Sequence, residues 1–361
     1  LAVGTPPGAD HQADLSQVET AAWQIANIMT EPKIIVTKST VPVGTGEKLR
    51  AVMEEKLTNL NKGLTFEIVS NPEFLREGSA VGDFLQPDRV VIGLERPDSP
   101  AKAVMLDLYR PLALGQGSII VTDIRSAEVI KYASNSFLAT KISFINEMAN
   151  FCQLCGADVE AVAQGMGLDK RIGSQFLRAS LGYGGSCFPK DVAALIQTGR
   201  QFGYQFQIIQ AAEAVNQKQR ALIVEMLTKE IALGGQTVAV WGLAFKANTD
   251  DIRESAPIEI IQKLLGQNRT VKIRAYDPAA GGRARELFEG EDRVKIVDDA
   301  ISAAKGAAAL LVLTEWDEFL TPDFSQLKKS LTKPLIIDGR NLYDPAKVRQ
   351  QGFTYLSIGR K

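Results

Sequence analysis

The sequence has few of the residues that mark several common protein classes. It contains three cysteines and one histidine in 361 residues. Three cysteines build no disulfide framework, which fits the reducing environment of the cytoplasm. No apolar run approaches the ~20 residues of a membrane span, and no secretory signal is visible. The formal net charge is only -1, so nothing points to a nucleic-acid or anionic-membrane partner.

What is present is the composition of an ordinary globular protein. Hydrophobic residues make up 45% of the chain and charged residues 23%. A chain of 361 residues is too long for one hydrophobic core, so two or three domains are expected. It opens with Leu1-Ala2-Val3-Gly4-Thr5, which looks like the end of a buried strand entering a turn. Exposed termini are usually polar, so we expect a fragment whose upstream part is missing.

Short β-branched strands alternate with helices in the first third of the chain. Strands are expected at 33–38, 66–70, 90–93 and 119–122, and helices at 14–29 (with Asp14 as its N-cap), 44–57 and 99–109. This alternation predicts a parallel, doubly wound sheet.

The periodicity changes after residue 125. Only helical segments are expected from there to about residue 233, including a long one at 125–155. That helix is apolar on more than one face, so it is expected to bridge domains or to pack against a second subunit. From residue 237 strands and helices alternate again, which predicts a second parallel-sheet domain.

The expected fold class is therefore α/β. Two Rossmann-like, doubly wound parallel-sheet domains are joined by a central helical region with a long helix. We expect the domain limits at 1–122, 123–233 and 234–361, the last of a normal size for one domain.

Cys187 is the most informative residue. It lies in Gly184-Gly185-Ser186-Cys187-Phe188-Pro189-Lys190-Asp191, a glycine-rich approach to an expected helix start. A helix N-terminus and the nearby Lys190 both favour thiolate over thiol, which predicts a nucleophile. The glycines are expected to let a ligand approach the backbone. The alternative is a buried structural cysteine, but Ser, Lys and Asp flank this one.

The second sheet opens with a possible nucleotide-binding turn. Trp241-Gly242-Leu243-Ala244-Phe245-Lys246 follows a strand, and the next strand ends in Asp277. This layout is typical of a nucleotide-binding βαβ unit whose ligand lies beyond the strand ends. The G-x-G-x-x-G fingerprint is absent from both sheets, so Gly242 alone indicates no more than a tight turn. Lys246 favours a contact with a phosphate or a sugar.

Three residue pairs share a four-residue spacing. They are Glu73 with Glu77, Lys131 with Asn135, and Cys187 with Asp191. Residues four apart project from one face of a helix, so each pair is expected to point into one pocket. Taken singly, such pairs usually belong to a solvated face. Lys131 is flanked by apolar residues, and a partly buried lysine beside an asparagine can stabilise an oxyanion.

Cys152 and Cys155 form a C-x-x-C at the end of the long helix. A zinc site needs two more ligands, and neither a second cysteine pair nor a nearby histidine exists. Redox pairs of this type follow a strand. Structural packing is therefore expected for both, and no metal site is predicted.

Five motifs together carry a family resemblance. They are Val3-Gly4-Thr5-Pro6-Pro7, Ser39-Thr40-Val41-Pro42-Val43-Gly44, and the segments 71–78, 184–191 and 241–246. In this order they resemble the nucleotide-sugar dehydrogenases, the UDP-glucose/GDP-mannose dehydrogenase family, along essentially the whole chain. The resemblance implies an N-terminal NAD-binding Rossmann domain, a central helical dimerisation region and a C-terminal UDP-sugar domain. The family's first βαβ unit, with its glycine-rich loop, has no counterpart here, which puts NAD affinity in question.

The resemblance also implies a reaction. Enzymes of the UDP-glucose type oxidise the C6 alcohol of UDP-glucose to the carboxylate of UDP-glucuronate and reduce two NAD molecules in turn. A thiolate captures the intermediate aldehyde as a thiohemiacetal, which a second oxidation converts into a thioester that water hydrolyses. By resemblance Cys187 is the nucleophile, and Lys131 and Asn135 stabilise the oxyanions. Asp191 activates water or takes the alcohol proton, Thr40 orients water, and Glu73 acts in hydrolysis.

Binding residues carry over in the same way. Contacts with NAD are implied for Thr5, Thr40, Glu77, Lys190 and Arg253. Contacts with the UDP-sugar are implied for Glu73, Phe74, Leu75, Arg76, Lys131, Asn135, Arg171, Phe176, Leu177, Arg178, Ser180, Tyr183, Gly184, Phe245, Lys246 and Arg340. In the family the residue that matches Arg171 reaches the neighbouring subunit's substrate, so a homodimer or a higher homo-oligomer is expected.

Three alternatives remain open from the sequence. The chain could prefer another nucleotide sugar, GDP-mannose or a UDP-N-acetyl-hexosamine, although residues 171–177 and 182–187 resemble the UDP-glucose type most. It could be a catalytically silent UDP-sugar-binding fragment. It could also be a helical scaffold without ligand chemistry.

Overall fold

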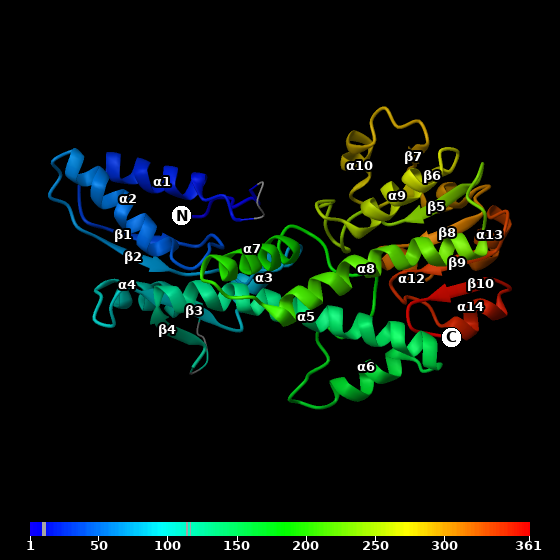
Figure 1. Cartoon of the computed structure of the whole chain (residues 1–361), viewed down its shortest axis with the longest axis horizontal. Coiled ribbons are helices and arrows are strands. Elements are labelled where there is room, and N and C mark those ends of the chain that lie inside the picture. The colour runs from blue at the N-terminus through cyan, green and yellow to red at the C-terminus, as the bar shows by residue number, and fades with distance from the viewer. Residues whose placement is uncertain (9–11, 113–114, 116) are drawn as a thin grey trace. The chain divides into compact units, whose positions relative to one another are not determined.

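The computed structural model describes residues 1–8, 12–112, 115 and 117–361. They form two compact units, Leu1–Ser136 with Lys190–Phe206, and Phe137–Pro189 with Gln207–Lys361. We call them the N-terminal and the C-terminal unit. Each contains its own sheet (Figure 1).

The N-terminal unit is built on a four-stranded sheet. Its strands are β1 (Lys33–Thr37), β2 (Phe66–Ser70), β3 (Val90–Leu94) and β4 (Ile119–Asp123), in the order β1-β2-β3-β4. The pairs β1/β2 and β3/β4 are parallel, but β2 and β3 run antiparallel, with Val69 opposite Leu94. The expectation of an entirely parallel sheet is therefore wrong for this one pair. Apolar periodicity identifies a strand but carries no information about its direction.

The N-terminal unit also contains several helices. They are α1 (Ser16–Ile28), α2 (Thr45–Asn59), α3 (Ala80–Leu85), α4 (Ala101–Tyr109), a short 3₁₀ turn η1 (Arg110–Leu112), and parts of α5 (Ile124–Cys155) and α7 (Phe188–Gln201). The buried residues of α1 and α2 pack with Ile35 and Ile68 in one cluster. Met105 of α4 packs with Val69 and Ile92 in another. Figure 1 shows α1 and α2 on one side of the strands and α4 on the other.

The first residues run alongside β1. The Leu1 amino group donates to the Val36 carbonyl, and the Leu1 carbonyl accepts from the Lys38 amide at 2.8 Å. This alternation is the hydrogen-bond pattern of a parallel ladder.

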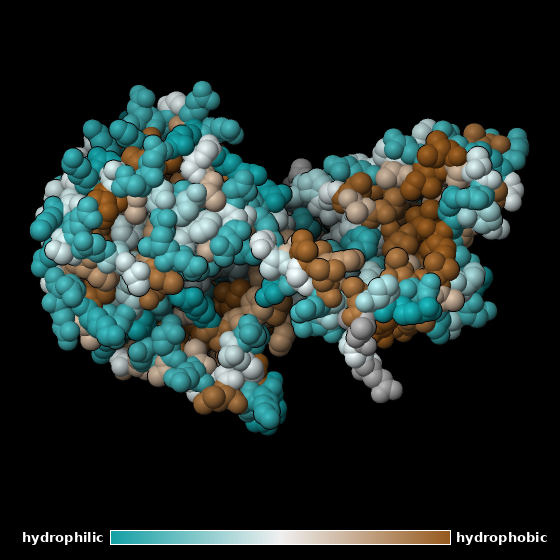
Figure 2. Space-filling model, turned by 180° about the vertical axis from the view of Figure 1, so that it is seen from behind, coloured by the Kyte–Doolittle hydropathy of each residue, from teal (hydrophilic) through white to brown (hydrophobic). Residues whose placement is uncertain are grey.

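At the right of Figure 2, apolar side chains gather on one face of the N-terminal unit.

The C-terminal unit contains a six-stranded, entirely parallel sheet. Its strands are β5 (Thr237–Trp241), β6 (Lys272–Tyr276), β7 (Val294–Ile296), β8 (Ala309–Val312), β9 (Leu335–Asp338) and β10 (Thr354–Ser357). The spatial order is β10-β9-β8-β5-β6-β7, so the chain winds outward from β5 in both directions. This is the doubly wound Rossmann order, as the sequence predicted.

Most of the remaining helices belong to this unit. They are α6 (Val159–Gly167), α8 (Gln207–Glu230), α9 (Ala256–Gln267), α10 (Gly281–Leu287), α11 (Ala300–Ala304), α12 (Asp317–Leu320), α13 (Phe324–Ser330) and α14 (Pro345–Gln350). Every residue of β8 and β9 is buried, as expected of central strands covered on both faces.

The stretch from β4 to β5 is fully described and contains helices but no strand. The expected helical region is thus present, whereas its status as a separate domain at 123–233 stays a prediction. Among the described residues no helix is both long and apolar enough to traverse a bilayer.

Candidate active site

Helix α5 places Lys131 and Asn135 on one buried face of the N-terminal unit. The Lys131 ammonium lies 3.1 Å from a carboxylate oxygen of Glu73. The Asn135 amide donates to the Asp191 carboxylate at 2.6 Å. Lys131 is 4% exposed and Asp191 is 1% exposed, so these charges are held away from water. Both residues of this four-residue spacing are thus buried on one helix, and their pointing into one pocket stays a prediction.

Helix α7 supplies the other side of this cluster. The Lys190 ammonium lies 2.6 Å from Asp191, so its charge is shared with that carboxylate. Asp191 therefore accepts from both Asn135 and Lys190. Lys190, the nearby cation that the sequence suggested for Cys187, is thus paired with a carboxylate of its own unit.

The pair Glu73 and Glu77 does not lie on a helix. Residues 71–76 have no helical structure, and 77–79 form a turn before α3. The expectation that these two glutamates project from one helical face is therefore wrong. Glu73 accepts a hydrogen bond from the Leu75 amide at 2.6 Å, and such local bonds compete with helix formation.

Phe74 lies between two cations. The Arg89 guanidinium is 3.8 Å from its ring centroid and the Lys131 ammonium is 5.4 Å away. These are cation–π distances. Arg76, implied in contacts with the UDP-sugar, is exposed and forms an ion pair with Asp83 at 2.6 Å.

Thr40 and Thr5 are joined at the end of β1. The Thr5 hydroxyl, which is buried, donates to the Thr40 carbonyl at 2.9 Å. Thr40 itself follows β1 in the loop that leads to α2. The two threonines implied as cofactor contacts therefore belong to one edge of the sheet.

Sequence reasoning missed a second lysine at this edge. Lys38 directly follows β1, and its ammonium lies 3.3 Å from the Asn71 side-chain oxygen and 3.5 Å from the Tyr109 hydroxyl. Burial lowers the pKa of Lys38, and its charge interacts with Glu73 and Lys131. Its position beside Thr40, where β1 ends, was the signal that could have identified it.

In the C-terminal unit, Cys187 stands immediately before α7. The thiol is free and exposed, which excludes the alternative of a buried structural cysteine. Its sulfur lies 3.7 Å from the Ser186 hydroxyl oxygen. Because α7 begins at Phe188, the sulfur occupies the N-terminal boundary of a 14-residue helix, where the helix dipole favours an anion.

The glycines before Cys187 serve packing within the protein. A Cβ on Gly184 would lie 2.3 Å from the Glu254 carbonyl oxygen, and one on Gly185 would lie 2.6 Å from the Phe245 ring. Gly185 also has a φ of +83°, which other residues rarely adopt. The chain itself thus fills the space where a side chain would lie at these two positions, and approach of a ligand to their backbone stays a prediction.

Tyr183 is fixed rather than open to solvent. Its hydroxyl donates to Glu213 at 2.5 Å, and its carbonyl accepts from Arg220 at 2.9 Å. Burial raises the pKa of Tyr183. Its ring packs edge-on to Phe188, which also contacts Phe176. Other predicted substrate residues in this segment are the buried Leu177 and Ser180 and the exposed Arg178.

Arg340 and Phe245 meet where the central strands of the second sheet end. The Arg340 guanidinium donates to the carbonyls of Phe245 at 2.7 Å and Leu313 at 2.8 Å. The Lys246 ammonium lies 5.4 Å from the Phe245 ring centroid. The sequence placed all three in substrate binding, and the structure brings them to the edge where parallel-sheet proteins bind ligands.

The turn after β5 is occupied by a carboxylate of the chain. Asp277 accepts hydrogen bonds from the amides of Leu243 at 2.7 Å and Ala244 at 2.9 Å. Gly242 has a φ of +94°, and a Cβ there would collide with Thr314. Asp277, which follows β6, thus fixes the conformation of this turn by binding two of its amides.

Two other arginines implied in ligand contacts are ion-paired within the chain. Arg171 is exposed and bound to Asp169 at 2.6 Å. Arg253, implied in NAD binding, is bound to the buried Asp251 at 2.7 Å and belongs to the C-terminal unit.

The C-x-x-C pair divides into one packed and one exposed thiol. Cys152 is buried in the main cluster of the C-terminal unit, whereas Cys155 is exposed. Both are free. The single histidine, His11, lies outside the described residues.

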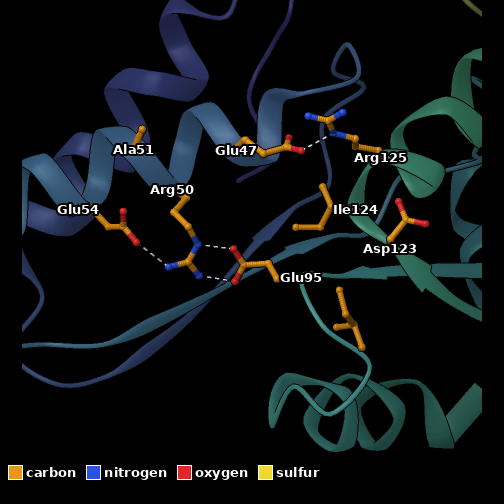
Figure 3. A pocket seen from close by; sticks show the side chains of 9 residues that line it. Glu47, Arg50, Ala51, Glu54, Glu95, Asp123, Ile124 and Arg125 are labelled. Carbon is orange, nitrogen blue, oxygen red and sulfur yellow. Dashed lines mark hydrogen bonds and ion pairs between the residues drawn. The ribbon is translucent and has the colours of Figure 1, made fainter.

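A pocket of about 490 Å³ lies among α2, the end of β3 and the start of α5. Figure 3 shows Arg50 held by Glu54 and Glu95, and Arg125 by Glu47. None of the predicted site residues lines it, so it is separate from the Lys131 cluster.

Comparison with known proteins agrees with the order of these parts along the chain. Residues 1–113 match the NAD binding domain of the UDP-glucose/GDP-mannose dehydrogenase family. Residues 125–218 match its central domain, and residues 239–345 its UDP binding domain. The chain belongs to this family.

Curated dehydrogenases of the family align with the whole chain. The UDP-glucose 6-dehydrogenase of Pseudomonas aeruginosa is 47% identical and is matched over 100% of this chain and 80% of its own length. That of Rhizobium meliloti is 45% identical over 100% of this chain and 81% of its own.

Solved structures of the family superpose on the fold. The UDP-glucose dehydrogenase of Pyrobaculum islandicum has a TM-score of 0.88 at 39% identity, covering 100% of this chain and 79% of its own. The UDP-D-ManNAc dehydrogenase of Pyrococcus horikoshii has a TM-score of 0.84 at 28% identity, covering 99% and 80%.

Proposed function

We propose that this dehydrogenase oxidises UDP-glucose to UDP-glucuronate in two successive steps, each of which reduces one NAD. The observation that carries the proposal is the exposed, free thiol of Cys187 at the start of α7, the helix that also carries Asp191. The identity of 47% to a UDP-glucose 6-dehydrogenase supports this substrate over the other nucleotide sugars.

Cys187 acts as the nucleophile. Oxidation of the C6 alcohol releases one proton and one hydride and leaves an aldehyde. The thiolate adds to the aldehyde carbon and forms a thiohemiacetal, which keeps the half-oxidised sugar bound. Loss of a second hydride gives a thioester, and water then releases the carboxylate and regenerates the thiol.

Lys131 and Asn135 stabilise the charge that develops on the substrate oxygen. Both are buried donors on one face of α5, and such donors are most effective where water is excluded. Asp191 takes a proton from the alcohol or from water, and its hydrogen bonds with Asn135 and Lys190 orient the carboxylate. Glu73 acts in thioester hydrolysis beside Lys131, and Thr40 orients the water.

NAD, when bound, accepts a hydride in each oxidation. The edge where β1 and β2 end offers donors and acceptors for its ribose and nicotinamide, with Thr5 and Thr40 hydrogen-bonded there and Glu77 half-buried nearby in sequence. Side chains of this kind fit a dinucleotide at the carboxyl ends of parallel strands. We also assign contacts with NAD to Lys190 and Arg253.

The UDP-sugar is held by the remaining predicted residues. Arg340 and Lys246 suit the phosphates, while Phe245 and Phe176 offer aromatic faces to the base and the sugar. The other substrate contacts are assigned to Glu73, Phe74, Leu75, Arg76, Lys131, Asn135, Arg171, Leu177, Arg178, Ser180, Tyr183 and Gly184.

A homodimer formed through α5 completes the proposal. Phe137, Phe144 and Phe151 follow one another at seven-residue intervals and are 67%, 43% and 59% exposed. Leu154 is 86% exposed. An apolar stripe of this spacing is typical of a helix that packs on another helix, and a second copy of α5 would cover it.

The stoichiometry of NADH tests the proposal directly. The full chain with UDP-glucose and NAD should yield two NADH for each UDP-glucuronate. Cys187→Ser should stop before completion, whereas Cys155→Ser, which removes another exposed thiol, should retain full turnover. One NADH with release of free aldehyde, or preferred turnover of GDP-mannose or a UDP-N-acetyl-hexosamine, would contradict the assignment.

A further inference from the structure

Glu128 is a buried carboxylate that none of the proposed chemical steps uses. It lies on α5 one turn before Lys131 and is 3% exposed. Its two oxygens accept hydrogen bonds from the Gly44 amide at 2.8 Å and the Gly46 amide at 2.9 Å. These amides belong to the start of α2, at the end of the loop that contains Thr40.

We propose that Glu128 is a positioning residue that ties the Thr40 loop to the turn of α5 that carries Lys131. The inference rests on the proposed oxidation of a nucleotide sugar for its catalytic consequence, but the tie itself is independent of that reaction.

The geometry leaves little freedom at this junction. A Cβ on Gly46 would lie 2.5 Å from an Ile124 side-chain carbon and 3.6 Å from a Glu128 carboxylate oxygen. The helix start therefore fits closely against the first turns of α5. The first amides of a helix have no partner within the helix, and Glu128 satisfies two of them from a different element.

The charge of Glu128 matters to this contact. An ionised carboxylate offers acceptors to both amides and interacts favourably with the positive end of α2. A protonated carboxyl, or a glutamine amide, turns one of its two ends into a donor that faces an amide N–H.

Few other charges face Glu128. Glu47 of α2 and Arg125 of α5 interact with it electrostatically, and the buried Tyr132 hydroxyl senses both Glu128 and Asp191. Burial raises the pKa of Glu128 to about 7, although the two amides counteract this.

Hydrogen–deuterium exchange of the full chain tests the tie without any assay of activity. After correction for intrinsic rates, the amides of residues 43–48 should be protected from exchange in the wild type at pH 8. Glu128→Gln should lower their protection at pH 8 by about tenfold, the effect of losing one hydrogen bond to a charged acceptor. Glu54→Gln, a matched change further along α2 on an exposed side chain, should leave it unchanged.

Kinetics then test the positioning role. We expect kcat for UDP-glucose to fall about ten- to hundredfold in Glu128→Gln with little change in KM, because small displacements of catalytic groups have effects of this size. Glu128→Asp, which keeps the charge, should recover part of the loss.

The exchange and kinetic experiments each have an outcome that would contradict one part of the proposal. Unchanged exchange in Glu128→Gln would overturn the tie, and lost protection with unchanged kcat would overturn the positioning role. If the wild type failed to oxidise UDP-glucose, the proposed function would fall, while the exchange result would still decide whether Glu128 holds the loop.

Discussion

Asn135 donates a hydrogen bond of 2.6 Å to Asp191 and so joins α5 to α7. Both residues are buried, and Asp191 also accepts from Lys190. The bond fixes the carboxylate in one orientation. Two helices far apart in sequence thus share one buried polar network.

Asp191→Asn should separate the charge of this residue from its shape. The variant keeps the volume but loses the proton acceptor, so we expect kcat to fall by about 10²–10⁴-fold, the usual contribution of a general base. Steady-state rates with UDP-glucose check this. Thermal unfolding measured in parallel serves as the control, and a collapse of stability equal to the loss of activity would argue for a purely structural carboxylate.

Gly185→Ala should destabilise the C-terminal unit. The residue has a φ of +83°, and its Cβ would lie 2.6 Å from the Phe245 ring. We expect a loss of about 1–3 kcal/mol in the free energy of unfolding, from backbone strain and overpacking together. Gly203→Ala has a similar φ of +73° but no neighbouring atom within 4 Å, so it measures the strain alone. Equal losses in the two variants would show that the contact with Phe245 contributes nothing.

Phe144→Ser should weaken self-association through α5. Its ring is 43% exposed within an apolar stripe, and central aromatic residues dominate the affinity of most interfaces. Light scattering coupled to size-exclusion chromatography should show a shift from dimer to monomer at micromolar concentration. Ile208→Ser, a change at a 72% exposed residue of α8, is the control. A wild-type chain that is monomeric at all concentrations would refute the interface.

Stability should fall as pH rises from about 4.5 to 7 on account of Glu128. Burial raises its pKa from 4.5 to about 7, so the folded protein binds the proton more tightly than the unfolded chain. The contribution is complete below pH 4.5 and is lost as pH passes 7. It amounts to at most about 3 kcal/mol. Urea unfolding from pH 5 to 8 should show this slope in the wild type and a flatter one in Glu128→Gln, and identical slopes would count against the shifted pKa.

The sequence was sufficient to predict the helices and strands, but it predicted less well which of them contact each other. The pattern after residue 237 predicted strands that alternate with helices, and the doubly wound order followed from this alternation. The antiparallel pairing of β2 and β3 was not predictable, because apolar periodicity is the same in both directions.

For the candidate site, too, the sequence predicted local placement better than contacts between distant residues. The spacing of Lys131 and Asn135 placed them on one face because they lie within a long helix. The same spacing failed for Glu73 and Glu77, where the Leu75 amide binds the Glu73 carboxylate and the segment is not helical. Lys38 and Glu128 escaped notice because their importance arises from partners that are distant in sequence.

The carboxylate of Asp277 has a consequence for how substrate preference can change. By occupying the Leu243 and Ala244 amides, it removes from the second sheet the backbone cradle that Rossmann folds usually offer to phosphates. Recognition must then come from exchangeable side chains such as Lys246 and Arg340. Sugar specificity in relatives can thus change through single side-chain substitutions, while the backbone of this turn keeps its conformation.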